Sequence, residues 1–191
     1  MLTDFQRNFL DLTTIIAQRQ YTALATFRLT VPDQFNWVRD VFEPLIVATN
    51  GERNLLELVN DEDHIPVILT YRQALEKCNQ LLNFLRSKSV QQKDRMFIMC
   101  GLHEGLWTSY LASIKGGFVL IPAASILNAD DVTYRFDKAF PTVIIADNDN
   151  VQKMEQALSN YKHPVAVKLL LDGTRDGWVS FDAIQSYQNE A

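Results

Sequence analysis

The sequence predicts an α/β fold, in which a doubly wound, mainly parallel sheet has helices on both faces. From about residue 94, short apolar runs alternate with amphipathic segments, in the order strand–helix four times over. The runs are continuously apolar, which is typical of parallel strands covered on both sides. Right-handed crossovers between such strands produce a doubly wound layer. An irregular N-terminal helical arm and a small hairpin are expected to precede the sheet.

Composition excludes several classes of protein. The 191 residues are enough for one domain with a proper core, and 47% hydrophobic with 21% charged residues is ordinary for a globular chain. A net charge of −5 gives no basic footprint for nucleic acid or for an anionic membrane. No apolar run approaches the roughly 20 residues that span a bilayer. Asp4 and Asp11 interrupt the N-terminal apolar residues, so we do not expect a signal peptide.

Two cysteines, Cys78 and Cys100, each lie within an apolar pattern. We interpret both as buried thiols that act as small hydrophobes, with a disulfide or a nucleophile as the lesser alternative. Their spacing does not resemble a metal-ligand motif. A reduced, cytoplasmic protein is the resulting expectation.

Residues 1–52 are predicted to form the N-terminal helical arm. Residues 2–17 place apolar side chains on one helical face, and Thr3 or Asp4 could cap the start. Pro32 and Pro44 are expected to break the segment that follows, with a short helix between them. We expect the first helix to pack on protein rather than on a membrane surface, because its polar face lacks a Lys/Arg majority.

Residues 53–191 are predicted to form the α/β unit, beginning with a hairpin. Asn54 to Val59 and Val67 to Leu69 read as strands, and the connector between them is acidic. Clustered carboxylates at 61–63 can bind a cation, but a solvated loop tip is the more ordinary interpretation. His64 in the same loop has no identifiable partner.

A helix is predicted from Thr70, where Thr70 and Gln73 match a capping box. After the strand at 96–100, a second helix is expected to bury a stripe of large side chains and to end at Gly116 in a left-handed cap. That stripe consists of Leu106, Trp107, Tyr110, Leu111 and Ile114.

The remaining elements follow the same alternation. Asn128 is predicted to cap a helix that has two aspartates in its first turn, where the helix dipole favours negative charge. Residues 142–146 and 165–171 are predicted as buried strands, with a helix over 148–159 between them. Ser180 is expected to cap a last short helix through Tyr187.

Motifs that carry chemistry by themselves are absent from the sequence. It contains no Walker loop, no nucleophile or zinc motif and no GxGxxG pattern. Gly116–Gly117 reads as a helix cap and a tight turn, and the three histidines, His64, His103 and His163, are scattered. The sequence therefore nominates no catalytic residue and no metal ligand.

Three segments, in order, resemble the adenylate-forming (AMP-binding) acyl-CoA synthetases, in particular their medium-chain branch. FNWVRDV at 35–41 is similar to the "FNxARD" start of that branch. LTYRQAL at 69–75 resembles the "LTYxEL" core motif, and ASIKGGFVLIP at 112–122 resembles "LKAGGAYVPL". The similarity covers roughly residues 35–187, and the order and spacing of the motifs make it specific.

The resemblance implies a two-step reaction. A carboxylic acid, such as a fatty acid, attacks ATP to form an acyl-adenylate with release of pyrophosphate, and coenzyme A then displaces AMP. Mg²⁺ would offset phosphate charge. The family's Ser/Thr/Gly-rich phosphate loop is expected shortly after residue 187 and is not in the sequence. The expectation is therefore an N-terminal subdomain of a synthetase, cut before the phosphate loop and inactive alone, with the acid bound by the missing part.

The resemblance also points to one ligand contact. In related acetyl-CoA synthetases the turn after the second core motif lies near coenzyme A, and the matching positions are Ala123, Ala124 and Ser125. An ordinary strand-to-helix loop is the alternative. The arginines that hold the coenzyme's phosphates in those relatives have no counterpart around Asn148 to Lys153.

A second function class stays open, namely a standalone, non-catalytic α/β binding or interaction domain related to synthetases. A cut domain exposes the surface that faced its missing half, so self-association through an apolar patch is expected of a fragment. The coding sequence beyond codon 191 distinguishes the two hypotheses. The identity of the acid, the oligomeric state and the strand order are not encoded in any pattern recognised in the sequence.

Overall fold

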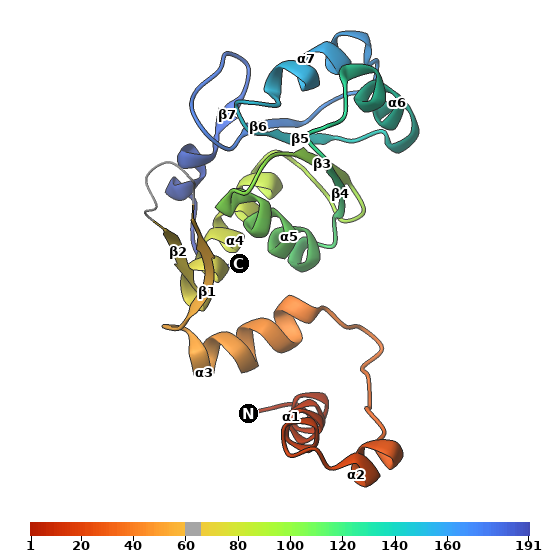
Figure 1. Ribbon diagram of the computed structural model, residues 1–191, viewed down its shortest axis with the longest axis vertical. Coiled ribbons are helices and arrows are strands. Elements are labelled where there is room, and N and C mark those ends of the chain that lie inside the picture. Colours follow the sequence, from red (N-terminus) through yellow and green to blue (C-terminus); the bar gives the residue numbers. More distant parts are fainter. Residues whose placement is uncertain (60–65) are drawn as a thin grey trace. The chain divides into compact units, whose positions relative to one another are not determined.

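The computed structural model describes residues 1–59 and 66–191, in two compact units, Met1–Thr49 and Asn50–Ala191 (Figure 1). The predicted acidic connector at 61–63 and His64 lie outside the described residues. Within the described residues, no helix is both long and apolar enough to cross a bilayer.

The second unit is built on a parallel sheet, as predicted, and this sheet has a fifth strand, β7 (Val179–Ser180), that the sequence did not predict. The other strands are β3 (Arg95–Met99), β4 (Val119–Ala123), β5 (Val143–Ala146) and β6 (Val167–Leu170). They are arranged in the order β4-β3-β5-β6-β7. Because β4 lies on one side of β3 and β5 on the other, the strand order reverses beside β3. In open α/β sheets this reversal point opens a crevice at the carboxyl ends of the strands.

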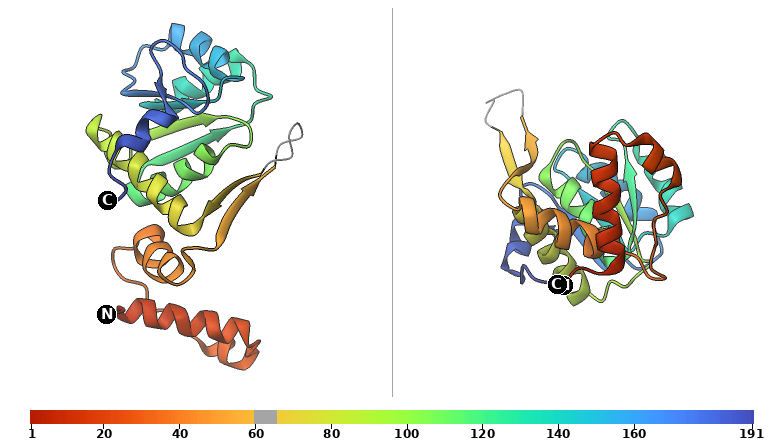
Figure 2. Two further views of the ribbon diagram at one scale, coloured as in Figure 1. Left: turned by 90° about the vertical axis from the view of Figure 1, so that its left-hand side faces the viewer. Right: turned by 90° about the horizontal axis from the view of Figure 1, so that it is seen from below.

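Helices cover both faces of this sheet, which confirms the predicted layers (Figures 1 and 2). The helices α4 (Tyr71–Ser87) and α5 (Glu104–Gly116) lie on one face, and α6 (Ala129–Ala139) and α7 (Val151–Asn160) lie on the other. Alternate residues of β3 enter the two cores: Met96 and Ile98 face α4, while Phe97 and Met99 face α6 and α7. This alternation explains why the strand is continuously apolar.

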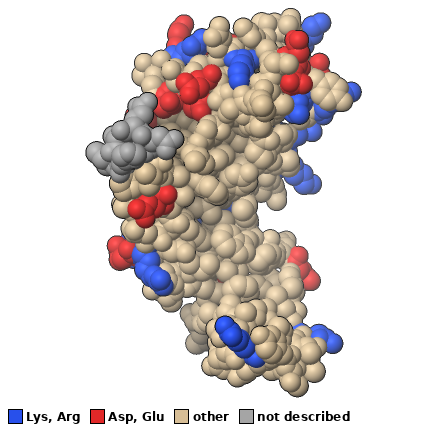
Figure 3. Space-filling model, in the orientation of Figure 1, with Lys and Arg blue, Asp and Glu red and all other residues tan. Residues whose placement is uncertain are grey.

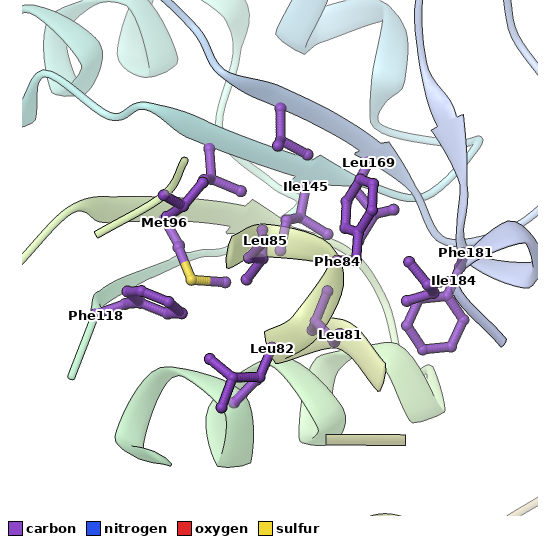
Figure 4. Close-up of a cluster of buried hydrophobic side chains, with 14 of the residues drawn as sticks. Leu81, Leu82, Phe84, Leu85, Met96, Phe118, Ile145, Leu169, Phe181 and Ile184 are labelled. Atoms are coloured by element: carbon purple, nitrogen blue, oxygen red, sulfur yellow. The ribbon is translucent and has the colours of Figure 1, made fainter. Parts of the chain in front are cut away.

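Figure 4 shows the core beneath α4, where Leu81, Leu82 and Leu85 lie in one buried cluster with Met96 and Ile145 of the strands. Phe181 and Ile184, from the 3₁₀ helix η2 (Phe181–Ser186), close one end of this core. Ser180 precedes η2 as expected, but its side chain makes no capping hydrogen bond. That prediction was therefore wrong in its chemistry, though right in its position.

Local capping signals were read correctly elsewhere. Thr70 Oγ1 accepts the Gln73 N–H at 3.2 Å, and Gln73 Oε1 accepts the Thr70 N–H at 2.9 Å. Asn128 and Asp131 form the same reciprocal pair at the start of α6. Such caps satisfy backbone N–H groups that a helix start leaves free. The hairpin is also present, as antiparallel β1 (Asn54–Leu58) and β2 (Val67–Thr70).

The predicted burial of α5 was only partly right: Leu106 and Leu111 are half-buried and pack against the core, but the other three residues of the predicted stripe are exposed. Trp107, Tyr110 and Ile114 are 42%, 37% and 41% exposed, while the buried face consists of small residues and one lysine. These buried residues are Gly105, Thr108, Ser109, Ala112, Ser113 and Lys115. Space accounts for the difference: a Cβ on Gly105 would approach Leu171 Cδ2 to 2.5 Å. A larger side chain therefore does not fit at Gly105, where α5 approaches Leu171.

The left-handed cap of α5 is Gly117 rather than Gly116. Gly117 has φ 71°, and Gly116 is the last helical residue. Gly116 is needed for space, because a Cβ there would meet the Phe118 ring at 2.5 Å.

The first unit is helical, as predicted. It contains α1 (Asp4–Ala17), α2 (Tyr21–Thr26) and η1 (Val38–Val47), and the short α3 (Ala48–Asn50) continues directly from η1. Thr3 caps α1 through Gln6, and Phe5 packs with Val41 and Leu45. The prediction that Pro44 breaks the chain was wrong, because η1 runs through it as a π-helix. Proline removes one backbone donor, and here the helix is widened instead of ended.

Candidate functional site at the carboxyl edge of the sheet

Four strands of the sheet end at one level. Met99 of β3 pairs with both Ala123 of β4 and Ala146 of β5, and Ala146 pairs with Leu170 of β6. The loops that follow these strands therefore meet at one edge, beside the point where the strand order reverses. This is where parallel α/β sheets bind ligands.

Asp147, directly after β5, holds this edge together. Its Oδ2 accepts the backbone N–H of Gly101 at 2.7 Å, which joins the loops after β5 and β3. Its Oδ1 accepts the N–H of Asn150 at 3.0 Å and the Asn150 amide at 2.7 Å. Both side chains are buried, Asp147 at 9% and Asn150 at 3% exposure. A carboxylate with three N–H donors is a fixed anchor for the surrounding loops.

The turn that was predicted to lie near coenzyme A is hydrogen-bonded to Asn150, which Asp147 in turn holds. Ala123 is the half-buried end of β4, and Ala124 and Ser125 are exposed in the loop that follows. Asn150 Nδ2 donates to Ser125 Oγ at 3.1 Å, and the Lys153 ammonium donates to the Ser125 carbonyl. Lys153 also reaches Asn150 Oδ1 at 3.3 Å. The loop is thus held by the start of α7, 25 to 28 residues later in the sequence.

Lys153 is the residue that sequence reasoning missed. Residues 148–153 contain no arginine, so the sequence predicted no phosphate contact there. Folding nevertheless brings the Lys153 ammonium to the turn at Ser125. The spacing from Lys153 to Asn150, one helical turn, was the only available signal. A cation, a serine hydroxyl and exposed backbone at one edge are suited to binding an anionic group such as a phosphate.

Cys100 lies at the same edge, in surroundings that disfavour its thiolate. Burial, with smaller contributions from the carboxylates of Asp147 and Asp172, raises the pKa of its thiol to about 12. The group is therefore a neutral thiol near pH 7, and the thiolate is the reactive form. Neither cysteine forms a disulfide, as expected, and Cys78 is fully buried as predicted, whereas Cys100 is only half-buried. The Asp172 carboxylate accepts the backbone N–H of Asn148 at 2.6 Å.

His103 has a structural position, as the cap of α5. Its Nδ1 accepts the Gly105 N–H at 2.9 Å, and its ring lies edge-on to Phe181. The ring of His163 lies edge-on to Phe140 and tilted against Tyr161, far along the chain from His103. Within the ranges that the structure describes, no three His, Cys, Asp or Glu side chains gather as a metal site would require.

The charges on one face of the second unit do not gather by sign. On the face shown in Figure 3, lysines and arginines are interspersed with aspartates and glutamates over the second unit. A single cation at Ser125 consequently acts locally, at contact distance, because scattered surface charges give little long-range attraction.

Comparison with known proteins gives the family. The AMP-binding enzyme family matches residues 50–190. The chain is 35% identical over 149 residues to 4-hydroxybutyrate–CoA ligase 1 of Metallosphaera sedula, covering 78% of this chain and 26% of that protein. It is 25% identical over 175 residues to a mitochondrial acyl-coenzyme A synthetase of Homo sapiens, covering 88% and 30%.

A solved structure, an anthranilate CoA ligase in complex with anthranoyl-AMP, has the same fold. It superimposes with a TM-score of 0.74 at 19% identity, over 84% of this chain and 30% of that one. The chain thus spans between a quarter and a third of the length of the proteins it matches. With the family matched over most of the second unit, the chain belongs to the AMP-binding enzyme family, whose members found here are acyl-CoA synthetases and CoA ligases.

Proposed function

We propose that this chain is the N-terminal part of an AMP-forming acid–thiol ligase, which activates a carboxylic acid with ATP and transfers the acyl group to coenzyme A. The family match over residues 50–190 is the observation that carries this proposal. The named relatives act on 4-hydroxybutyrate and anthranilate, which share little except a carboxylate. The substrate class is therefore a carboxylic acid, for which a fatty acid is one candidate. The proposed location of the enzyme is the cytoplasm.

The role of this part in the reaction is to present coenzyme A. Ala123, Ala124 and Ser125 form the contact, and Lys153 supplies the positive charge for a phosphate of the coenzyme. The ammonium of Lys153, which donates to the Ser125 carbonyl, supports this role, because a cation that is already held at the turn loses little side-chain freedom on binding. Mg²⁺ and ATP are assigned no residues here, so the chain alone is expected to form no thioester.

A titration with coenzyme A tests this contact. We expect millimolar coenzyme A to shift the backbone amide resonances of Ala124, Ser125 and Lys153, and Lys153→Met to weaken that binding several-fold. Lys162→Met, which removes an exposed lysine after α7, is the matched control and should leave the affinity unchanged. Equal binding by both variants would remove Lys153 from the site.

The larger proposal is tested by the coding sequence and by activity. We expect a Ser/Thr/Gly-rich loop ending in Pro-Lys within about fifteen codons of codon 191, by ordinary loop lengths. The product of that reading frame should form thioesters only with ATP, Mg²⁺ and a carboxylic acid present. A natural stop at codon 191 would contradict the ligase proposal for this chain.

One observation favours the second candidate, a non-catalytic interaction domain. Trp107, Tyr110 and Ile114 form an exposed apolar strip along α5. Such a strip is typical of a surface that another protein surface covers. Sedimentation over a range of concentrations, combined with the activity assay, distinguishes the two. Association through this strip with no ATP-dependent activity in the complete gene product would favour the interaction domain.

A further inference from the structure

A row of carboxamide side chains on α4 holds the last residues of the chain. Asn79 Nδ2 donates to the Asn189 carbonyl at 2.8 Å, and Gln80 Nε2 donates to the Gln185 carbonyl at 3.0 Å. Asn83 Nδ2 donates to the carbonyls of both Gln188 and Glu190, at 2.9 and 2.8 Å. These positions share one face of the helix. The segment is bound through its backbone and is therefore held irrespective of its side chains.

Asn79 is the buried member of this row, and Lys115 determines which way its amide points. The Lys115 ammonium, 3% exposed, donates to Asn79 Oδ1 at 2.7 Å. An ammonium has donors only, so it can meet the oxygen of the amide but not the nitrogen. With Oδ1 turned toward Lys115, Nδ2 is left to face the Asn189 carbonyl.

Lys115 lies in the last turn of α5, where the helix dipole stabilises a positive charge. This position offsets part of the cost of burying the ammonium. The same residue belongs to the second core motif, between Ser113 and the glycine pair. The motif is thereby connected, through one side chain of α4, to a segment more than 70 residues further along the chain.

We propose that Lys115 is a positioning residue, which acts through Asn79 to fix the path of the chain at residues 188–190. The inference rests on the proposed function for its purpose: in the family resemblance, the phosphate loop follows this segment. A fixed exit point would then give the phosphate loop a defined starting position relative to the sheet. Hydrophobic support comes from Tyr187, whose ring lies edge-on to Phe84 at 5.5 Å.

Backbone order measured by ¹⁵N relaxation tests this proposal on the 191-residue chain. In the unmodified protein, residues 188–190 should have order parameters close to the rigid value of about 0.85. Asn79→Asp keeps an acceptor for Lys115 but cannot donate to Asn189, so these order parameters should fall below about 0.6. The thermal midpoint should move by less than about 4 °C, because the contact with Lys115 is retained.

Two further variants separate positioning from simple packing. Lys115→Met should also loosen residues 188–190, but it should add no further loss of order when Asn79→Leu is already present, because the effect passes through Asn79. Asn160→Asp, the same substitution at the exposed end of α7, is the control and should leave the segment ordered.

The proposal is overturned if Asn79→Asp leaves residues 188–190 as ordered as in the unmodified protein. It is also overturned if Lys115→Met loosens the segment equally with and without Asn79. Ligase activity does not enter this measurement. A failure of the proposed positioning role of Lys115 and a failure of the proposed ligase function are therefore distinguishable outcomes.

Discussion

The helices α4 and α5 cover the same face of the sheet, but they differ in the size of the side chains that they bury completely. α4 buries large side chains, among them Leu81, Leu82 and Leu85, and exposes polar ones. α5 buries small residues and a lysine, and leaves about two fifths of the surface of Trp107 and Tyr110 exposed, at 42% and 37%. A helix that approaches its neighbours closely needs small residues at the contact, so its largest side chains remain available for other surfaces.

The comparison predicts a large loss of stability at α4 and a small one on the outer face of α5. Leu82→Ala should lower the free energy of unfolding by about 2–5 kcal/mol, because it opens a cavity in the core shown in Figure 4. Urea denaturation gives the value. Ile114→Ala on the outer face of α5 is the control, and an equal loss there would show that this face is covered.

Enlarging a residue on the inner face of α5 tests how closely it packs. Ala112→Leu should cost about 1–3 kcal/mol of unfolding free energy, because Ala112 is fully buried and a larger side chain there would overpack the core. Ala183→Leu, an exposed position in η2, makes the same change where space is available. If Ala112→Leu raised the urea midpoint, the close packing of α5 would be refuted.

The start of α4 provides a smaller effect. Thr70→Ala removes one half of the capping box and should cost about 1 kcal/mol, whereas Thr70→Ser keeps the hydroxyl and should restore most of it. The same urea titration measures both. Equal stability of the Ala and Ser variants would mean that the cap contributes little to α4.

The smallest effect on folding is expected at the exposed strip of α5. Trp107→Gln should change the free energy of unfolding by less than about 0.5 kcal/mol, since the side chain is 42% exposed. If the strip mediates self-association, the same change should lower the sedimentation coefficient at high protein concentration. A loss of several kcal/mol would instead place Trp107 in the core.

Much of the fold could be predicted because its signals are local. The capping pairs at Thr70 and Asn128 need only residues three apart, and doubly covered strands are apolar throughout. The face of α5 could not be predicted, because the space available beside Gly105 is set by Leu171, 66 residues later. Periodicity identifies a helix face by its large residues, and here tertiary packing selected the small ones. The strand β7 was missed because it is two residues long.

Less of the candidate site could be read from the sequence. The motif that ends at Pro122 predicted a ligand contact in the turn that follows it, and the structure places that turn at the carboxyl edge of the sheet. The hydrogen-bond partners of Ser125 could not be predicted in this way, because Asn150 and Lys153 follow it in the chain only after α6 and β5. No spacing rule relates residues that meet only through the order of strands in a sheet.

The level ending of β3, β4, β5 and β6 has an evolutionary consequence. Because every strand stops at one height, each loop beyond it can lengthen, shorten or change composition without shifting the hydrogen-bonded ladder beneath. Mutations that alter ligand contacts are thus separated from mutations that alter folding. A lineage carrying this scaffold can exchange an arginine for a lysine, or move it to another loop, while the sheet is inherited intact.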